Sequence, residues 1–197
     1  MMIYIMTKKA IITIGGKPGS GKSTTAKALA KVLGYEHYST GHFFRQIAID
    51  RGLTVTELNI EAEKDPSIDN EIDTKAKALN DKSMIVVDSR LAFHFVPESF
   101  KVYLRINPED AAQRMFEDMK NNEERQNTEA SYSDVLELEK DAFSRYESEN
   151  KRYEAFYNVD PSDYDQYDLV IDTGDKKNSI DVVTQRIMEE YLKHINA

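Results

Sequence analysis

The chain has 197 residues, 40% of them hydrophobic, so we expect a single domain over residues 1–197 with a sizeable core. It contains no cysteine, which excludes disulfides, a thiolate nucleophile and a zinc site built on sulfur. A net charge of −9 without a basic tail makes polymeric nucleic acid a poor partner. No apolar run reaches the roughly 20 residues of a membrane span, so we expect no membrane partner. We also expect a cytoplasmic location, with which the lack of cysteine is consistent, and a monomer by default.

The stretch that organises the chain reads Gly-Lys-Pro-Gly-Ser-Gly-Lys-Ser over residues 16–23 and fits the phosphate-binding pattern G-x-x-x-x-G-K-[ST]. An apolar run at 10–14 predicts a strand before it. Apolar residues at helical spacing over 24–33 predict a helix after it. Strand, glycine-rich loop and helix form the context that the motif needs. The apolar stretch 1–6 is interpreted as a leader into the sheet and not as a signal peptide.

The residue types of this loop match the chemistry of a nucleoside triphosphate site. The glycines let the backbone adopt positive φ and turn its N–H groups toward an anion, at the start of a helix that adds partial positive charge. Lys22 is expected to reach the β- and γ-phosphates, and Ser23 to ligate Mg²⁺ through its hydroxyl. The alternative is a glycine-rich turn that binds nothing. The predicted ATP-binding residues here are Gly16, Lys17, Pro18, Gly19, Ser20, Gly21, Lys22, Ser23 and Thr24.

Strands and helices alternate along the rest of the chain. Besides the first strand, the patterns predict strands at 35–39, 84–87, 101–106 and 168–172. They predict a helix that ends at residue 50, a helix from a capping box at Thr54 to residue 63, and a helix over 67–80. Further helices are predicted from the Asn107 cap onward, from a Ser133 cap to about residue 153, and over 179–195. The polar stretch 120–133 is the best candidate for a mobile segment. The whole predicts a parallel five-stranded α/β sheet with helices on both faces and a ligand at the carboxyl ends of the strands.

Asp88 ends an apolar strand, as the carboxylate of a Walker-B motif does. From there it could hold Mg²⁺ through water or orient an acceptor phosphate, and the alternative is an Asp that caps a turn. Asp88 and Ser23 together form the candidate metal site. The four histidines show no spacing typical of metal ligands and are expected to be ordinary surface or core residues.

Arginines are the other candidates, because the guanidinium binds phosphate oxygens bidentately and stays charged. Arg45 follows a Thr-Gly turn after the second strand, and Arg90 follows Asp88, so we favour a functional role for both. Arg145 and Arg152 are seven residues apart and are expected to lie on one side of a helix, about 10 Å apart along its axis. Spacing alone does not decide whether this pair has a function.

The sequence resembles the nucleoside monophosphate kinases, and most closely the short, archaeal-type cytidylate kinases. The resemblance covers nearly the whole chain and rests on residues 11–23, 39–45, 63–73, 87–92, 145–153 and 167–173. It implies a P-loop NTPase fold with a helical segment for the monophosphate at 40–80 and a lid segment at 114–150, of which about 119–134 is acidic. The implied reaction transfers a phosphoryl group from ATP to CMP or dCMP, with Mg²⁺ as cofactor and small nucleotides as the only partners.

The resemblance also implies roles for single residues. Lys22, Asp88, Arg145 and Arg152 would act in catalysis, with the two arginines gripping the phosphates near the point of transfer. Arg114 and Thr173 would contribute to the ATP site, with Thr173 in the loop that passes the adenine. The implied substrate-binding residues are Thr40, Gly41, Arg45, Asp88, Arg90 and Arg152.

Two other classes of function stay open. A different P-loop kinase acting on another monophosphate, shikimate or a dephospho-coenzyme A-like acceptor would share the loop and lose the dependence on CMP. A nucleotide-binding protein without transferase activity would bind ATP or GTP only. The chain lacks the guanine-reading Asn-Lys-x-Asp, since residues 175–178 have the wrong order, which argues against a GTPase.

Overall fold

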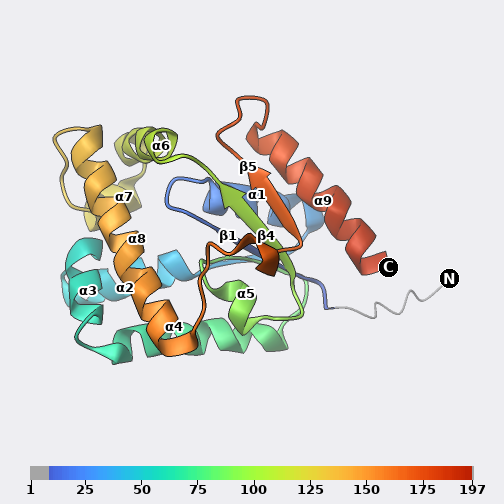
Figure 1. Cartoon of the computed structure of the whole chain (residues 1–197), viewed down its shortest axis with the longest axis horizontal. Coiled ribbons are helices and arrows are strands. Elements are labelled where there is room, and N and C mark those ends of the chain that lie inside the picture. Colours follow the sequence, from blue (N-terminus) through green and yellow to red (C-terminus); the bar gives the residue numbers. More distant parts are fainter. Residues whose placement is uncertain (1–8, 197) are drawn as a thin grey trace.

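Five parallel strands form one sheet in the computed structural model, which describes residues 9–196 (Figure 1). The strands are β1 Ile11–Gly16, β2 Glu36–Ser39, β3 Ile85–Asp88, β4 Phe100–Arg105 and β5 Leu169–Asp172, in the order β2-β3-β1-β4-β5. This confirms the predicted parallel five-stranded sheet. The stretch at residues 1–6 lies outside the described residues.

The strand order places a ligand site at the end of β1. The connection after β1 leads to β2 at one edge of the sheet, and the connection after its neighbour β4 leads to β5 at the other edge. Open α/β sheets bind ligands at such a switch point. The register aligns the ends of the strands, since Asp88 pairs with both Ile14 of β1 and Ser39 of β2, and Gly16 pairs with Leu104 of β4. The residues that follow these strands therefore meet at one edge.

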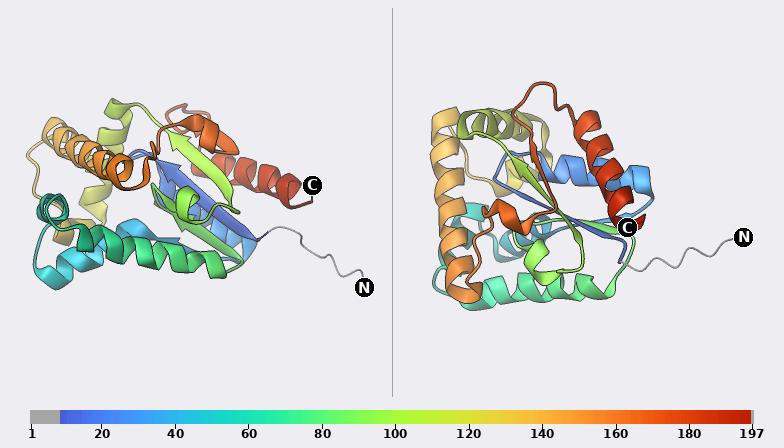
Figure 2. Two further views of the ribbon diagram at one scale, coloured as in Figure 1. Left: turned by 60° about the horizontal axis from the view of Figure 1, so that its bottom comes forward. Right: turned by 45° about the vertical axis from the view of Figure 1, so that its right-hand side comes forward.

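Helices cover both faces of the sheet, as predicted (Figure 2). On one face, α1 Lys22–Leu33 and α9 Ile180–Asn196 bury Leu29, Ile187 and Tyr191 against strand residues such as Ile12 and Leu104. On the other face, α4 Pro66–Ala78 and α5 Ala92–Phe95 pack on β1 and β3, together with aromatic residues from the end of α8 Val135–Tyr157. Burying apolar side chains on both faces is what holds a parallel sheet.

Two groups of helices extend beyond the carboxyl edge of the sheet. The first is α2 Thr40–Arg51, α3 Val55–Ala62 and α4, followed by a short 3₁₀ helix at Leu79–Asp81. The second is α6 Pro108–Asn121, α7 Glu123–Thr128 and α8. The groups touch, because α3 packs on α8 and α7 contacts α2, and in Figure 1 they stand together at the left of the sheet. They enclose the space in which the candidate site lies.

Several details differ from the sequence-based expectation. The stretch 120–133 contains helix α7, where Asn122 accepts a hydrogen bond from the Arg125 amide and Thr128 is fully buried. The N-cap of α8 is Asp134 and not Ser133, which instead donates to the Glu137 carboxylate. Helix α8 also runs four residues further than predicted, and α5 and a 3₁₀ helix at Tyr164–Gln166 were not anticipated because they are too short to show periodicity.

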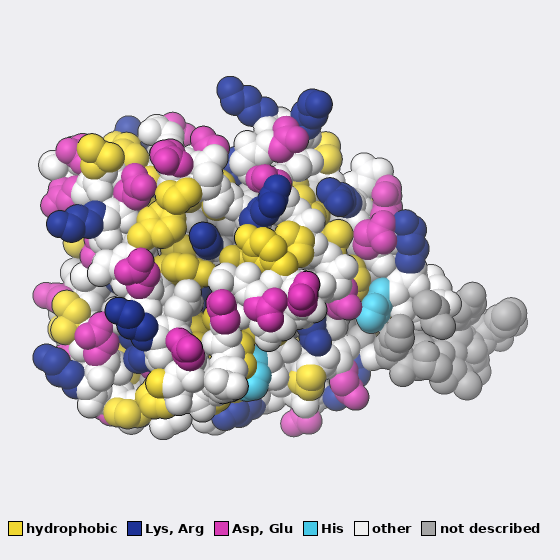
Figure 3. All heavy atoms as spheres, viewed as in Figure 1, with side chains coloured by type: hydrophobic (Ala, Val, Ile, Leu, Met, Phe, Trp, Pro, Cys, Tyr) yellow, Lys and Arg dark blue, Asp and Glu magenta, His cyan; other side chains and the backbone are white. Residues whose placement is uncertain are grey.

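Charge is dispersed over the part of the surface shown in Figure 3, where acidic and basic side chains alternate. Within residues 9–196, none of the helices combines the length and the apolar character that crossing a membrane requires.

The N-cap of α6 tests how much local signals contribute to stability. The Asn107 side chain accepts a hydrogen bond of 2.8 Å from the Asp110 amide, and Pro108 follows at the first helical position. We predict that Asn107→Ala lowers the free energy of unfolding by about 1 kcal/mol, because that amide loses its partner. Urea denaturation measures the change, and Asn107→Ser, which keeps a capping oxygen, is the control that should stay close to the unsubstituted protein.

Candidate active site

The phosphate-binding loop adopts the conformation that its glycines predict. Gly16, Gly19 and Gly21 all have positive φ, at 143°, 73° and 85°. A Cβ on Gly19 would come within 2.5 Å of the Ala111 carbonyl oxygen, so the loop packs directly on α6 and only glycine fits there. Gly21 is the N-cap of α1, and Lys22 and Ser23 begin that helix. The loop and the helix N-terminus therefore form the anion-binding arrangement expected from the motif.

Two cavities flank this loop. The first lies between the loop, α2, α4, the residues after β3, and α8, and it contains Pro18, Lys22, Ser23, Thr40, Gly41, Arg45, Asp88, Arg90, Arg145 and Arg152. The second lies between the loop, α6 and the start of α9, and it contains Gly19, Ser20, Gly21, Thr24, Arg114 and Thr173. Arg125 of α7 lines both cavities. Of the residues predicted for the site, Gly16 and Lys17 line neither cavity, and Lys17 instead accepts a hydrogen bond from Lys22.

Lys22 is a half-buried cation next to other cations. Its Nζ donates a hydrogen bond of 2.7 Å to the Lys17 carbonyl. Burial, together with the nearby positive charge of Arg90, lowers the pKa of Lys22 to about 7, although Asp88 acts in the opposite direction. A phosphate bound at this point would favour the ammonium form. The side chain is therefore prepared for an anionic ligand.

Asp88 lies at the end of β3 and is almost completely buried. Burial alone would raise the pKa of Asp88, but hydrogen bonds from His37, Ser39 and Ser23 outweigh it and lower the pKa below its ordinary value. His37 Nε2 lies 3.1 Å from Asp88 Oδ2. This contact exists because β2 pairs with β3, which brings His37 next to the strand that ends in Asp88.

The donor set of Ser23 and Asp88 fits Mg²⁺ held jointly with a nucleotide. Mg²⁺ usually keeps several waters and takes one or two protein oxygens together with substrate phosphates. Ser23 and Asp88 line the same cavity, and Ser23 is close enough to Asp88 to help lower the pKa of its carboxyl group. Among the residues that the structure describes, no group of three or more His, Asp or Glu side chains could hold a metal. Bound phosphates and waters would supply the other ligands of Mg²⁺.

Each of three arginines in the first cavity is paired with a carboxylate. Arg90 forms an ion pair with Glu149 and lies 5.5 Å from the centre of the Tyr146 ring. Arg145 Nη2 lies 2.9 Å from Glu129, and its Nε lies 3.1 Å from Asp141. Arg145 and Arg152 line the same cavity, which confirms that they share one side of α8.

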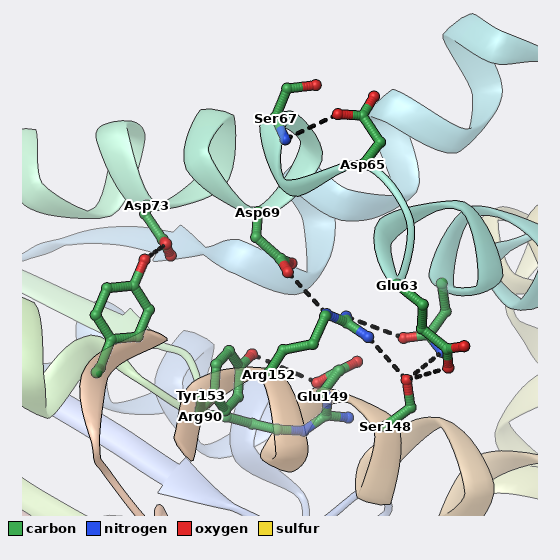
Figure 4. A network of polar contacts seen from close by, with 12 residues as sticks. Glu63, Asp65, Ser67, Asp69, Asp73, Arg90, Ser148, Glu149, Arg152 and Tyr153 are labelled. Atoms are coloured by element: carbon green, nitrogen blue, oxygen red, sulfur yellow. Dashed lines mark hydrogen bonds and ion pairs between the residues drawn. The ribbon is translucent and has the colours of Figure 1, made fainter. Parts of the chain in front are cut away.

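Arg152 joins three helices (Figure 4). Its Nε donates to Asp69 of α4 at 2.7 Å, Nη1 to Ser148 of α8 at 2.8 Å, and Nη2 to Asn59 of α3 at 3.2 Å. The Ser148 hydroxyl in turn donates to Glu63 at the end of α3. With only 8% of its surface exposed, Arg152 is a link between helices as well as a candidate ligand of phosphate.

The second cavity connects the loop to the end of the sheet. Arg114 of α6 donates a hydrogen bond of 2.7 Å to the Thr173 carbonyl. Thr173 Oγ1 lies 3.1 Å from the carbonyl oxygens of both Ser20 and Arg105. The turn after β5 is thereby tied to the phosphate-binding loop, and the two predicted residues Arg114 and Thr173 are in direct contact.

Several cavity residues were not found from the sequence. They are Asp69, Asp73, Glu129, Glu149 and Tyr153. Asp69 and Asp73 are four residues apart on a predicted helix, so they share one face, and this spacing was a usable signal. Glu149 and Glu129 could not be found, because their partners Arg90 and Arg145 lie on other elements of the fold.

The Arg152 contacts give a prediction on stability. We expect Arg152→Met to lower the free energy of unfolding by about 3 kcal/mol, because Asp69 is left buried without its partner. The double variant Arg152→Met/Asp69→Asn should regain part of this loss, since no buried charge is left unpaired. Urea denaturation of both variants measures it, and a single variant as stable as the unsubstituted protein contradicts the role as a link.

Comparison with known proteins places this site in a family. A family model described as AAA domain matches residues 12–137. The cytidylate kinase of Methanothrix thermoacetophila is 36% identical over 179 residues, covering 90% of this chain and 97% of that protein. The cytidylate kinase of Archaeoglobus fulgidus is 32% identical over 186 residues, covering 92% and 97%. An S-adenosylmethionine-dependent nucleotide dehydratase of Lacinutrix mariniflava is 35% identical over 187 residues, and the match spans 36% of that longer protein.

Solved structures agree on the fold. Shikimate kinase from Bacteroides thetaiotaomicron has a TM-score of 0.61 at 16% identity, covering 93% of this chain and 98% of that one. A gluconokinase from Sinorhizobium meliloti has a TM-score of 0.58 at 12% identity, covering 95% and 94%. Likeness at this identity supports the P-loop kinase fold alone, whereas the sequence relatives span almost the whole chain. The chain therefore belongs to the cytidylate kinases, within the nucleoside monophosphate kinase family.

Proposed function

We propose that this protein transfers the γ-phosphoryl group of ATP to CMP or dCMP, giving ADP and the corresponding diphosphate. The observation that carries the proposal is the pair of cavities on either side of the phosphate-binding loop, with Arg125 on the wall of both. A transferase needs two substrates that meet at one phosphoryl group, whereas a protein that only binds a nucleotide needs one site. The identity with archaeal cytidylate kinases supports the choice of acceptor.

The second cavity is the proposed donor site. Its wall of loop residues, Arg114 and the turn at Thr173 suits an adenosine, with the phosphates running along the loop toward Lys22. Ser23 and Asp88 would hold Mg²⁺, which supplies positive charge between the β- and γ-phosphates and fixes their orientation.

The first cavity is the proposed acceptor site. Arg45 and the turn at Thr40 and Gly41 face the same space as Lys22 and Arg90, so the acceptor phosphate is placed beside the end of the loop. We propose residues 40–80 as the monophosphate-binding segment and 114–150 as the lid, because these helical groups form the walls of the cavity.

The charges at the site favour direct in-line transfer of the phosphoryl group, without a covalent enzyme intermediate. An acceptor phosphate is already a nucleophile, so no general base is needed. Charge on the migrating group is spread over its three outer oxygens, and Lys22, Arg90, Arg145 and Arg152 border the space where it would form. Helix α7 contacts α2 beside the cavity, and we expect this contact to help keep water away from the transferring group.

The acceptor is tested by measuring ADP release from ATP and Mg²⁺ with CMP, dCMP, UMP, AMP, GMP and shikimate, each added separately. Turnover with CMP or dCMP well above the others is the expected result. Turnover with shikimate or a purine nucleotide alone moves the chain to another acceptor. ATP binding without turnover on any acceptor identifies a nucleotide-binding protein and contradicts the proposal.

Lys22 gives a second test of the mechanism. Lys22→Ala should lower kcat by about two to three orders of magnitude, because a preorganised charge at the transferring group is lost. Lys27→Ala, an exposed lysine on the same helix, is the matched control and should keep full activity. Near-normal turnover of a folded Lys22→Ala protein would show that this lysine does not act in the transfer.

A further inference from the structure

Asp73 is a buried carboxyl group on the wall of the first cavity. It lies on α4, one helical turn after Asp69, and only 6% of its surface is exposed. The Tyr157 hydroxyl, from the end of α8, donates a hydrogen bond to Asp73 Oδ2. In Figure 4 a dashed line marks this hydrogen bond at the labelled Asp73.

Asp73 differs from Asp69 in how its charge is balanced. Asp69 has the Arg152 guanidinium at 2.7 Å. For Asp73, the part of the chain that the structure describes offers no cation within ion-pair distance, and Lys77 on the same helix acts only as a weaker, more distant charge. Burial raises the pKa of Asp73 despite the Tyr157 hydrogen bond, and the charge of Asp69 adds to this effect. The Asp73 carboxylate can therefore accept a further hydrogen bond, and a ligand in the cavity could provide the donor.

The surroundings of Asp73 suit a nucleobase and not a phosphate. The nearby wall formed by α2, α3 and α4 contributes Phe44, Val55 and Ile72, which are apolar. The cations that attract phosphate come mostly from the loop, the residues after β3, α7 and α8, and Arg45 comes from α2. A nucleoside monophosphate that places its phosphate beside Lys22 and Arg90 directs its base toward the apolar wall, where Asp73 supplies a polar group.

A carboxylate at Asp73, which can only accept hydrogen bonds, favours cytosine over uracil. An ionised carboxylate accepts hydrogen bonds and donates none, and one of the Asp73 oxygens is already bonded to Tyr157. Cytosine carries an amino group at position 4, which donates, whereas uracil carries a carbonyl oxygen there, which only accepts. A carboxylate facing that position gains a charge-assisted hydrogen bond from cytosine and repels uracil.

We propose that Asp73 is the residue that selects the acceptor base, by accepting a hydrogen bond from the exocyclic amino group of cytosine and excluding the carbonyl of uracil. Tyr157 is the positioning residue that holds this carboxylate in place. The inference rests on the proposed function, since it assumes that a pyrimidine monophosphate occupies the first cavity.

The test compares kcat/KM for CMP and UMP in the unsubstituted protein and in Asp73→Asn. An Asn amide can turn its NH₂ group toward a carbonyl, so the CMP-to-UMP ratio should fall at least about tenfold, mainly through better use of UMP. Glu71→Gln is the matched control, because Glu71 is on the same helix, pairs with Lys75 and does not line the cavity. Its ratio should stay unchanged.

A second measurement does not depend on a variant that folds. The monophosphate of pyrimidin-2-one riboside lacks the amino group and puts nothing in its place, so the unsubstituted protein should use it about tenfold to a hundredfold less well than CMP. Equal use of CMP and this analogue overturns the assignment of Asp73, as does an Asp73→Asn protein that is active but keeps the original ratio. If the unsubstituted protein uses neither CMP nor UMP, the proposed function itself fails, and the inference fails with it.

Discussion

The pairing of cavity arginines with carboxylates is the interaction on which the site depends. Guanidinium groups stay charged at any ordinary pH, so burying several of them in one cavity requires anions nearby. Glu149, Glu129 and Asp69 supply these anions to Arg90, Arg145 and Arg152. Lys22 is handled differently, because a lysine can lose its proton, and its lowered pKa is the result. The acidic composition of the chain is thus compatible with a site for polyanions.

These pairs also connect the site to the helices around it. Arg152 bonds α4, α3 and α8 at once, and Arg145 reaches Glu129 at the end of α7. Under the proposed function, a phosphate that binds these arginines replaces carboxylate oxygens instead of entering an uncompensated cationic cavity. Such an exchange changes the contacts of α7, which also carries Arg125 between the two cavities. Binding of a phosphate by these arginines is then coupled to closure of the helices that form the walls of the cavity.

The sequence predicted the features that depend on neighbouring residues. The conformation of the three loop glycines, the Asn107 cap and the sheet with its five strands follow from short patterns of residue type. Ser133 was the wrong cap because two neighbouring polar residues, Ser133 and Asp134, can both cap, and the sequence does not say which one takes the extended conformation. Helix α7 was missed because its side chains are nearly all polar, so no periodicity marked it.

The base-binding end of the cavity could not be predicted for a different reason. A phosphate is bound by backbone N–H groups and strand-end residues, which a local motif specifies, so phosphate sites can be recognised in a sequence. A base is recognised by single side chains whose environment comes from other helices. Asp73 is one of 35 acidic residues in the chain, and two features distinguish it: the hydrogen bond from Tyr157, 84 residues away, and the absence of an ion-pair partner among the described residues. Selectivity within a kinase family can therefore change by substitutions that leave its recognisable motifs intact.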